Sequence, residues 1–468
     1  MIKSLPFPFA KANEVLLEWD EARRVPVLYH SRKTPLSVLQ EVCRLNGPVE
    51  RHLEESEPLL KRLGDSYARA EQNAAQVVDE VGEALDLSKL LQDMPESVDL
   101  METTDDAPVI RMINSLLRQA TRDGASDVHM EAFERQSVVR FRVDGELRDV
   151  VEMRPDLHAA LVSRIKIMAS LDIAEKRLPQ DGRISIRVGG RAVDIRVSTL
   201  PTAHGERIVM RLLEKNYDRL DIKGLLAGDT YETFNKLLHK PHGIVLVTGP
   251  TGSGKTTTLY ASLLALRSKT SNIMTVEDPV EYDLEGIGQI HVNSKIDMTF
   301  ARALRAILRQ DPDIVMIGEI RDLETAQIAV QASLTGHLVL ATLHTNNAPA
   351  AVTRLMDMGV EPFLLASSLL GVLAQRLVRR CCPQCHGAGC DACNQTGYAG
   401  RGGIYELMEV NEPIRELMNK HASEAEIRKQ AMASGMHTLA EDCERLVQEG
   451  KTTREEMLRV TGSMELEG

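Results

Sequence analysis

The stretch Gly249-Pro250-Thr251-Gly252-Ser253-Gly254-Lys255-Thr256 fits the Gly-x4-Gly-Lys-Ser/Thr phosphate-binding pattern without a gap. It follows the β-branched run of residues 244–248 and precedes residues 256–267, whose composition suits a helix. Glycines allow the backbone to curl so that its N–H groups converge, and the helix that follows adds the positive end of its dipole. Strand, loop and helix in this order predict a nucleoside triphosphate site rather than a glycine-rich turn that matches by chance.

The polar residues of this loop have distinct expected roles. Lys255 can reach the β- and γ-phosphates, and the Thr256 hydroxyl can ligate Mg²⁺. The predicted contacts to ATP are Gly249, Pro250, Thr251, Gly252, Ser253, Gly254, Lys255, Thr256 and Thr257.

Apolar runs and helix-compatible segments alternate after residue 243. The runs are residues 244–248, 273–276, 314–317 and 338–342, and a helix is expected after each of the first three. This alternation predicts an α/β domain with a parallel sheet that helices cover on both faces.

Acidic residues follow two of these predicted strands. Glu277-Asp278-Pro279-Val280-Glu281 comes directly after the run 273–276, and Glu319 follows the run 314–317. Because the carboxyl ends of parallel strands border the ligand crevice, these acids are expected near the phosphates. A carboxylate there can orient an attacking water or hold Mg²⁺. Glu281 and Glu319 are therefore candidate catalytic residues, and the alternative is that they are surface carboxylates.

Two histidines, His337 and His344, bracket the last predicted strand. A single histidine is more often structural than catalytic, and the residues by themselves favour neither role for this pair.

An α+β module is expected before the phosphate loop. Residues 137–143 lead into an Asp144-Gly145 turn, and a second pair of alternating runs meets at Gly189-Gly190. Both patterns are typical of two-residue β-hairpins. A helical pattern at residues 157–171 lies between the two hairpins.

Cysteines crowd together near residue 390. Cys382-x2-Cys385-x4-Cys390-x2-Cys393 forms two Cys-x2-Cys knuckles, the spacing of a closed tetrahedral Zn²⁺ site. In a reducing compartment such crowding favours a metal over disulfides. We predict that these four residues bind zinc, and the sequence leaves open whether Cys381 or His386 replaces one of them.

The composition excludes some classes of function. A net charge of −12 and only 3% aromatic residues argue against a nucleic-acid translocase, which needs a basic track and stacking rings, so no nucleic-acid partner is expected. The first residues lack an apolar signal core, and no apolar run is long enough to span a bilayer. We expect a cytoplasmic protein that reaches a membrane only through partners.

Four boxes of the nucleotide domain resemble those of the secretion ATPases of the type II secretion and type IV pilus family. The phosphate loop, the block 277–281, residues 311–322 and residues 335–345 look like that family's Walker A, Asp, Walker B and His boxes. The resemblance implies a homo-hexameric ring, with ATP bound at the seam between a PAS-like α+β domain and a RecA-like domain.

The resemblance also implies roles for single residues. Glu281 would orient the water, Glu319 would be the Walker B acid, and the two histidines would form the His-box pair. Arg196 and Arg211 match the arginines that reach the γ-phosphate in that family. The implied catalytic set is Glu281, Glu319, His337, His344, Arg196 and Arg211.

The opening of the chain resembles the type II secretion member of the family. Leu5-Pro-Phe-Pro-Phe-Ala-Lys11 and Val15-Leu-Leu17 look like the start of that member, which docks on the cytoplasmic domain of an inner-membrane protein and acts with an inner-membrane platform protein. The implied function is to power protein export by driving pseudopilus assembly at the inner membrane. The alternatives are a type IV pilus assembly ATPase, a nucleotide-sensing scaffold and a DNA-translocating motor.

These inferences divide the chain into seven expected segments. They are a mainly helical docking domain (1–92), an acidic linker (93–107), the α+β domain (108–215), a linker (216–241), the RecA-like core (242–380), the tetracysteine zinc knot (381–402) and a helical C-terminal region (403–468).

Overall fold

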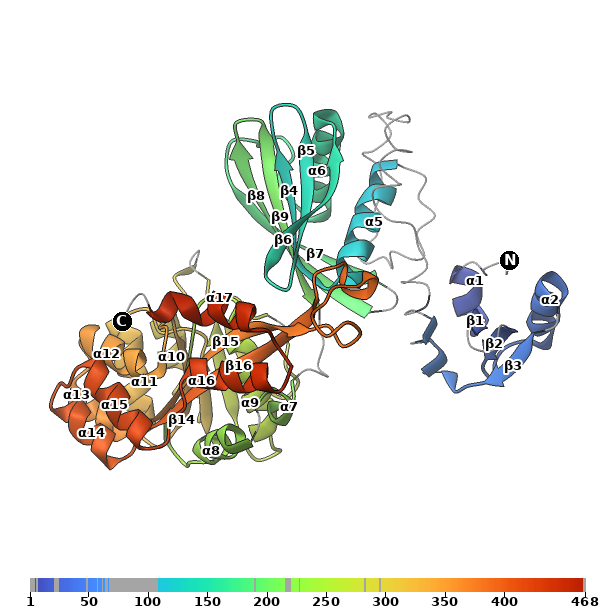
Figure 1. Cartoon of the computed structure of the whole chain (residues 1–468). Coiled ribbons are helices and arrows are strands. Elements are labelled where there is room, and N and C mark those ends of the chain that lie inside the picture. The colour runs from blue at the N-terminus through green and yellow to red at the C-terminus, as the bar shows by residue number, and fades with distance from the viewer. Residues whose placement is uncertain are drawn as a thin grey trace. The chain divides into compact units, whose positions relative to one another are not determined.

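The computed structural model divides the chain into two units, residues 1–215 and 216–468 (Figure 1). The structure describes residues 108–188, 191–214, 220–226, 228–281, 283–293 and 296–465, together with 5, 7–20, 25–47, 49–56, 58–60, 62–63 and 66. Each unit is described by itself below.

The described part of the N-terminal segment is a small sheet with helices, and residues 56, 58–60, 62–63 and 66 are also helical. Its elements are α1 (Phe7–Ala12), β1 (Val15–Asp20), β2 (Val25–His30), α2 (Leu36–Asn46) and β3 (Glu50–Leu53). The sheet order is β1-β2-β3, with the first pair antiparallel and the second parallel.

This sheet stands beside the expected helices, and most of the described residues of the segment that lie in regular elements are helical. The two runs that form β1 and β2 are rich in Val, Leu, Trp and Tyr, and they are short enough to pair as neighbouring strands. Buried leucines and valines from both strands and from α2 form the core of this small domain. The predicted acidic linker, 93–107, lies outside the described residues.

The second domain of this unit is an antiparallel sheet covered by helices on one face. Its strands pair in the order β6-β5-β4-β9-β8-β7. The elements are α5 (Pro108–Arg122), β4 (Ala125–Ala132), β5 (Ser137–Val143), β6 (Glu146–Met153), α6 (Pro155–Met168), β7 (Gln180–Val188), β8 (Arg191–Thr202) and β9 (Gly205–Glu214). Apolar residues of α5 and α6 pack with the inward-facing residues of the strands.

The two predicted hairpins are present. Asp144 and Gly145 both have positive φ, 51° and 91°, as a two-residue hairpin turn requires, and they join β5 to β6. β7 and β8 also pair antiparallel, and the turn residues Gly189 and Gly190 lie outside the described residues.

The second unit is built on a seven-stranded sheet of order β12-β11-β13-β14-β10-β15-β16. Its strands are β10 (Gly243–Thr248), β11 (Ile273–Glu277), β12 (Gly288–His291), β13 (Ile314–Ile317), β14 (Leu338–Leu343), β15 (Leu369–Cys381) and β16 (Tyr398–Glu409). All neighbours are parallel except β15 and β16. The four predicted strands are thus confirmed.

Helices cover both faces of this sheet, as predicted. They are α7 (Ile222–Leu225), α8 (Gly228–Leu238), α9 (Lys255–Leu266), α10 (Phe300–Ile307), α11 (Leu323–Leu334), α12 (Ala348–Asp357) and α13 (Pro362–Ser368). One core joins the sheet to α10–α13, and the other joins it to α7–α9. Every residue of β10, β13 and β14 is buried, which explains why these strands are continuous apolar runs.

Two of the expected boundaries differ from the structure. Described residues of the supposed linker 216–241 form α7 and α8, because Phe234, Leu237 and Leu238 share one helix face and pack into the core. The sheet also continues beyond residue 380, since β16 returns from the cysteine-rich segment and pairs along β15.

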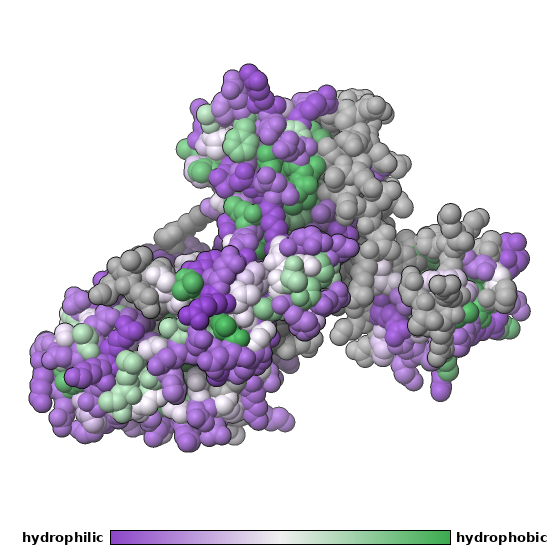
Figure 2. Space-filling view, in the orientation of Figure 1, coloured by the Kyte–Doolittle hydropathy of each residue, from purple (hydrophilic) through white to green (hydrophobic). Residues whose placement is uncertain are grey.

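Four helices follow the sheet: α14 (Glu412–Asn419), α15 (Glu424–Ala433), α16 (Leu439–Gln448) and α17 (Arg454–Glu465). Ser423 and Thr438 begin two of them with capping boxes. On the face of the second unit that Figure 2 shows, hydrophilic residues predominate, with hydrophobic ones in small groups. None of the helices in the described ranges combines the length and apolar composition needed to cross a membrane.

Candidate nucleotide and metal sites

The phosphate loop lies between the carboxyl end of β10 and the start of α9. Gly249, Gly252 and Gly254 have φ values of 147°, 79° and 90°, which side-chain-bearing residues rarely adopt. A Cβ atom on Gly249 would also lie 2.6 Å from the Ser253 Oγ. The backbone path of the loop therefore requires glycine at these positions.

Lys255 is folded back onto the loop. Its Nζ donates to the carbonyl oxygens of Gly249 at 2.7 Å and Pro250 at 3.0 Å. Burial lowers the pKa of Lys255 to about 8, although the charge of Glu319 acts in the opposite direction. The Ser253 Oγ is buried and, among the described residues, has no hydrogen-bond partner. A cationic group and an unused hydroxyl in one glycine-rich loop fit a phosphate ligand.

Glu319, at the carboxyl end of β13, brings the predicted Walker B acid to this loop. It accepts a hydrogen bond from Arg321 at 2.7 Å, and His344 Nε2 lies 3.4 Å from its other oxygen. Burial opposes ionisation of Glu319, but Arg321, His344 and Lys255 hold its pKa below the ordinary value. The structure therefore brings Lys255, Glu319 and His344 together.

The protonation state of His344 follows from the same group. Burial and the positive charge of Lys255 lower its pKa, and the opposing effect of Glu319 is smaller. A neutral imidazole beside an ionised carboxylate can donate or accept one hydrogen bond without adding charge.

The acidic block after β11 divides into a buried and a partly exposed residue. Glu277 is 3% exposed and is held by the hydroxyls of Tyr260 and Thr275 and, at 3.1 Å, by the Gln289 amide. Glu281 is half-buried, and its backbone N–H donates to the Tyr260 hydroxyl at 3.3 Å. Glu277 is thus a structural acid, whereas Glu281 lies on the segment that leaves the strand.

His337 does not join the group around Lys255. It precedes the amino end of β14, roughly 20 Å of strand from His344. Its Nδ1 lies 2.8 Å from the Ala332 carbonyl oxygen, in the last turn of α11. These contacts are those of a helix C-terminus, and a catalytic role for His337 stays a prediction.

Arg196 and Arg211 face each other across neighbouring strands of the first unit. They are register partners on β8 and β9, and Arg183 on β7 is the next residue in the same row. Arg211 is 58% exposed, and its Nε donates to the buried Asp127 at 2.9 Å. The two arginines therefore present one cationic row, and their contact with a nucleotide stays a prediction.

Sequence reasoning missed two residues of this region. Arg321 could have been found, because it lies two positions after Glu319 in the same acidic box. Tyr260 could not, because nothing in the apolar pattern of α9 distinguishes a tyrosine that contacts Glu277 from an ordinary core residue.

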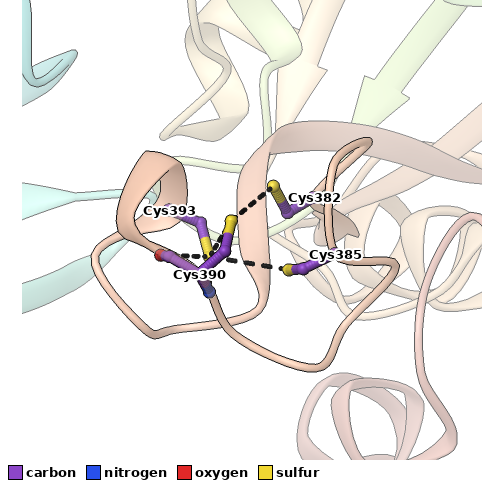
Figure 3. A group of neighbouring side chains, drawn as sticks. All are labelled: Cys382, Cys385, Cys390 and Cys393. Carbon is purple, nitrogen blue, oxygen red and sulfur yellow. Dashed lines mark hydrogen bonds between the residues drawn. The ribbon is translucent and has the colours of Figure 1, made fainter.

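The four predicted cysteines converge at the tip of the β15–β16 hairpin (Figure 3). Their sulfur atoms all lie within 4.8 Å of one another. Three of the separations are Cys382–Cys390 at 3.9 Å, Cys385–Cys393 at 3.8 Å and Cys390–Cys393 at 3.7 Å. A tetrahedral Zn²⁺ with Zn–S bonds of about 2.3 Å requires sulfurs about 3.8 Å apart.

Backbone N–H groups around the knot point at the sulfurs, as expected for thiolate ligands. Gly389 donates to Cys385 and Gly397 donates to Cys393, both at 3.2 Å. The N–H groups of Gln384 and Cys385 lower the pKa of the Cys382 thiol. Neither Cys381 nor His386 belongs to the group, so the arrangement favours the four cysteines as the ligand set, which stays a prediction.

Comparison with known proteins places these sites in a family. Residues 102–459 match the family model described as type II/IV secretion system protein, and residues 4–67 match that of an N-terminal domain of GSPII protein E. The chain is 60% identical to the type II secretion system protein HxcR of Pseudomonas aeruginosa, covering 98% of this chain and 99% of the relative. It is 50% identical to the type II secretion system ATPase E of Vibrio cholerae, covering 98% and 97%.

A solved structure with the same fold is that of the pilus retraction motor PilT with bound ADP. It is 28% identical with a TM-score of 0.55, covering 74% of this chain and 95% of the motor. The chain therefore belongs to the type II/IV secretion system protein family and, within it, to the type II secretion system protein E ATPases.

Proposed function

We propose that this chain is the Mg²⁺-dependent ATPase that powers protein export through a type II secretion system. The observation that carries the proposal is the group formed by Lys255, Glu319 and His344 at the carboxyl ends of three parallel strands. Nucleotides bind at this edge of open α/β sheets. A cation for the phosphates and an acid for the metal are the parts that ATP hydrolysis requires there.

The residues of the loop would hold the nucleotide. Lys255 would leave the carbonyls of Gly249 and Pro250 for the β- and γ-phosphates, and Thr256, exposed in the first turn of α9, would ligate Mg²⁺. Bound Mg²⁺ would neutralise charge on those phosphates. Glu319 would hold the metal through its carboxylate, and Glu281 would orient the attacking water.

The active form that we propose is a ring of six copies. Arg196 and Arg211 would complete the site from the α+β domain, where a cation can stabilise the charge that develops on the transferred phosphoryl group. Support comes from their position as register partners on neighbouring strands, with the Arg211 side chain mostly exposed.

Residues 1–92 are the proposed docking segment. Residues 4–67 match the family model of the GSPII protein E N-terminal domain, and this part has its own small core. We propose that it binds the cytoplasmic domain of an inner-membrane secretion protein, so that the ATPase is cytoplasmic and peripheral and drives pseudopilus assembly with an inner-membrane platform protein. We also propose one structural Zn²⁺ per chain at the four cysteines, together with the segment divisions as corrected above.

The type II secretion role is favoured over type IV pilus assembly. Two relatives named for type II secretion are at least 50% identical to the chain over 98% of its length, including the N-terminal segment.

Two substitutions in the full-length protein test the function. Lys255→Ala removes the charge that holds the phosphates, so ATP binding is expected to weaken strongly and turnover to fall to background. Glu319→Gln should retain ATP binding and lower turnover by roughly two orders of magnitude, because the charge on the metal-facing group is lost. Phosphate release and equilibrium binding of ATP, each with and without Mg²⁺, measure the two effects. Normal turnover in the Lys255→Ala variant would refute the proposal.

A further inference from the structure

Gln375 is a buried amide on β15, the strand next to β10 in the sheet. It is only 2% exposed, although glutamine is usually a surface residue. A buried amide is costly to retain unless each of its polar atoms has a partner.

Both ends of this amide bond to the phosphate loop and its helix. The Nε2 donates to the carbonyl oxygen of Ser253 at 2.7 Å, and the Oε1 accepts from the Thr258 hydroxyl at 2.8 Å. The amide orientation follows from Ser253, because a carbonyl oxygen can accept only from the NH₂ end.

The phosphate loop also packs closely against Gln375. An ideal Cβ on Gly254 would lie 3.1 Å from the Gln375 Nε2, and one on Gly249 would collide with the Gln375 carbonyl oxygen. Two glycines of the phosphate-binding pattern thus provide the clearance that lets the loop lie against this one residue.

The strand that carries Gln375 is itself firmly held. Four residues further on, the Arg379 side chain and backbone N–H bind the buried Glu456 of α17 at 2.8–2.9 Å, and the Arg379 guanidinium lies over the Tyr398 ring. β15 ends at Cys381, directly before the first cysteine of the knot. Gln375 therefore ties the phosphate loop to a strand that is anchored beyond it.

We propose that Gln375 is a positioning residue of the nucleotide site, which holds the phosphate loop in the shape that binds the phosphates. It does not touch the reacting atoms itself. The proposal deepens the ATPase function and depends on it, because nucleotide is the ligand whose binding the loop shape controls.

The Gln375→Glu variant removes the donor to Ser253 and leaves the bond to Thr258 in place. The carboxylate keeps the acceptor for Thr258 but replaces the donor by an oxygen that faces the Ser253 carbonyl and brings negative charge under the loop. We expect ATP to bind about tenfold more weakly, while turnover at saturating ATP changes much less. The matched control is Gln448→Glu, which adds the same charge at an exposed position at the end of α16 and should bind ATP as the unmodified protein does.

Substitutions of Thr258 test the other bond. Thr258→Val removes the hydroxyl with little change in shape and should weaken ATP binding in the same direction, whereas Thr258→Ser keeps the hydroxyl and should restore it. Combining Thr258→Val with Gln375→Leu should weaken binding by less than the product of the two single effects, because both remove one shared bond.

Two measurements on the full chain separate the outcomes: the dissociation constant of ATP by equilibrium binding, and turnover at saturating ATP. The melting temperature without nucleotide serves as a check on folding. Unchanged ATP affinity in both Gln375→Glu and Thr258→Val overturns the proposal, as does loss of turnover with unchanged affinity. If Gln375→Glu does not fold, the Thr258 pair decides. If Lys255→Ala also binds and hydrolyses ATP normally, the ATPase assignment fails rather than the role of Gln375.

Discussion

Lys255 is an amine held under conditions that disfavour its charge. It is partly buried in the loop, and its hydrogen-bond partners are two neutral carbonyl oxygens. A bound triphosphate would place negative charge beside the Lys255 amine. Its binding should therefore raise the pKa of Lys255 towards the ordinary value.

The affinity for ATP should therefore depend on pH through Lys255. Without nucleotide, burial lowers the pKa of Lys255 to about 8, and bound phosphates should raise this pKa. Below about pH 8 the amine is protonated in both states, so affinity is constant; above it, binding must take up a proton, and affinity should fall by up to about tenfold per pH unit. Phosphate itself no longer titrates there, since its second pKa is about 6.

Equilibrium binding of ATP between about pH 7 and about pH 9.5 spans this dependence. The Lys255→Ala variant is the control, because its weak residual binding should lose the slope above about pH 8. A flat profile in the unmodified protein would contradict the lowered pKa.

The β15–β16 hairpin connects the nucleotide sheet to the cysteine knot. Its two strands pair from Gly371–Glu409 outward to Cys381–Tyr398, and the knot closes the far end. Few apolar residues are buried within the knot itself, so the metal must supply much of its folding free energy.

Replacing Cys390 by serine should show this dependence on the metal. A serine hydroxyl is a poor zinc ligand, so we expect zinc content to fall from one per chain to well below one, with lower solubility and melting temperature. Loss of ATPase activity should follow from lost structure. Elemental analysis and thermal unfolding measure the effects, and Cys43→Ser is the matched control, since Cys43 lies on α2 of the N-terminal domain. Freshly purified protein without stoichiometric zinc would rule out the site.

The whole molecule divides its functional groups between two units. The phosphate loop, Glu319 and His344 lie in the second unit, whereas Arg196 and Arg211 lie in the first. In our proposal, a complete ATPase site needs residues of both units. Its activity should therefore also depend on assembly of the chains into a ring.

Arg211→Ala should lower turnover by roughly a thousandfold while the fold is retained. The side chain is mostly exposed, so its removal creates no cavity, although Asp127 loses one partner. Arg135→Ala, in the exposed turn between β4 and β5, is the matched control.

In the unmodified protein, ATPase activity per chain should rise with protein concentration as rings form. Phosphate release across a dilution series measures both effects, and full activity in a verified monomer would contradict them.

Deleting residues 1–92 should separate catalysis from docking. The sequence of this segment carries no catalytic motif, so basal ATP hydrolysis should persist, whereas recruitment to the inner membrane and secretion in cells should be lost. Membrane fractionation and a secretion assay, with the full chain as reference, provide the measurements. Membrane localisation of the truncated protein in the presence of its partners would show that docking lies elsewhere.

Local patterns in the sequence were enough to predict the nucleotide domain. The phosphate loop, the strands of the parallel sheet and the spacing of the four cysteines are all local, because strand period, glycine conformation and ligand spacing depend on near neighbours. The same local patterns predicted the domain boundary near residue 215 and the acidic residues at the carboxyl ends of two strands.

Tertiary structure decided which of these residues meet. Glu277 and Glu281 are four positions apart, yet only the packing of Tyr260 makes the first a buried structural acid. His337 and His344 flank one strand, and the direction of that strand places only His344 at the phosphate loop. Gln375 contacts Ser253 across 122 positions of sequence. Such contacts depend on how strands are ordered in the sheet, and no local pattern encodes that order.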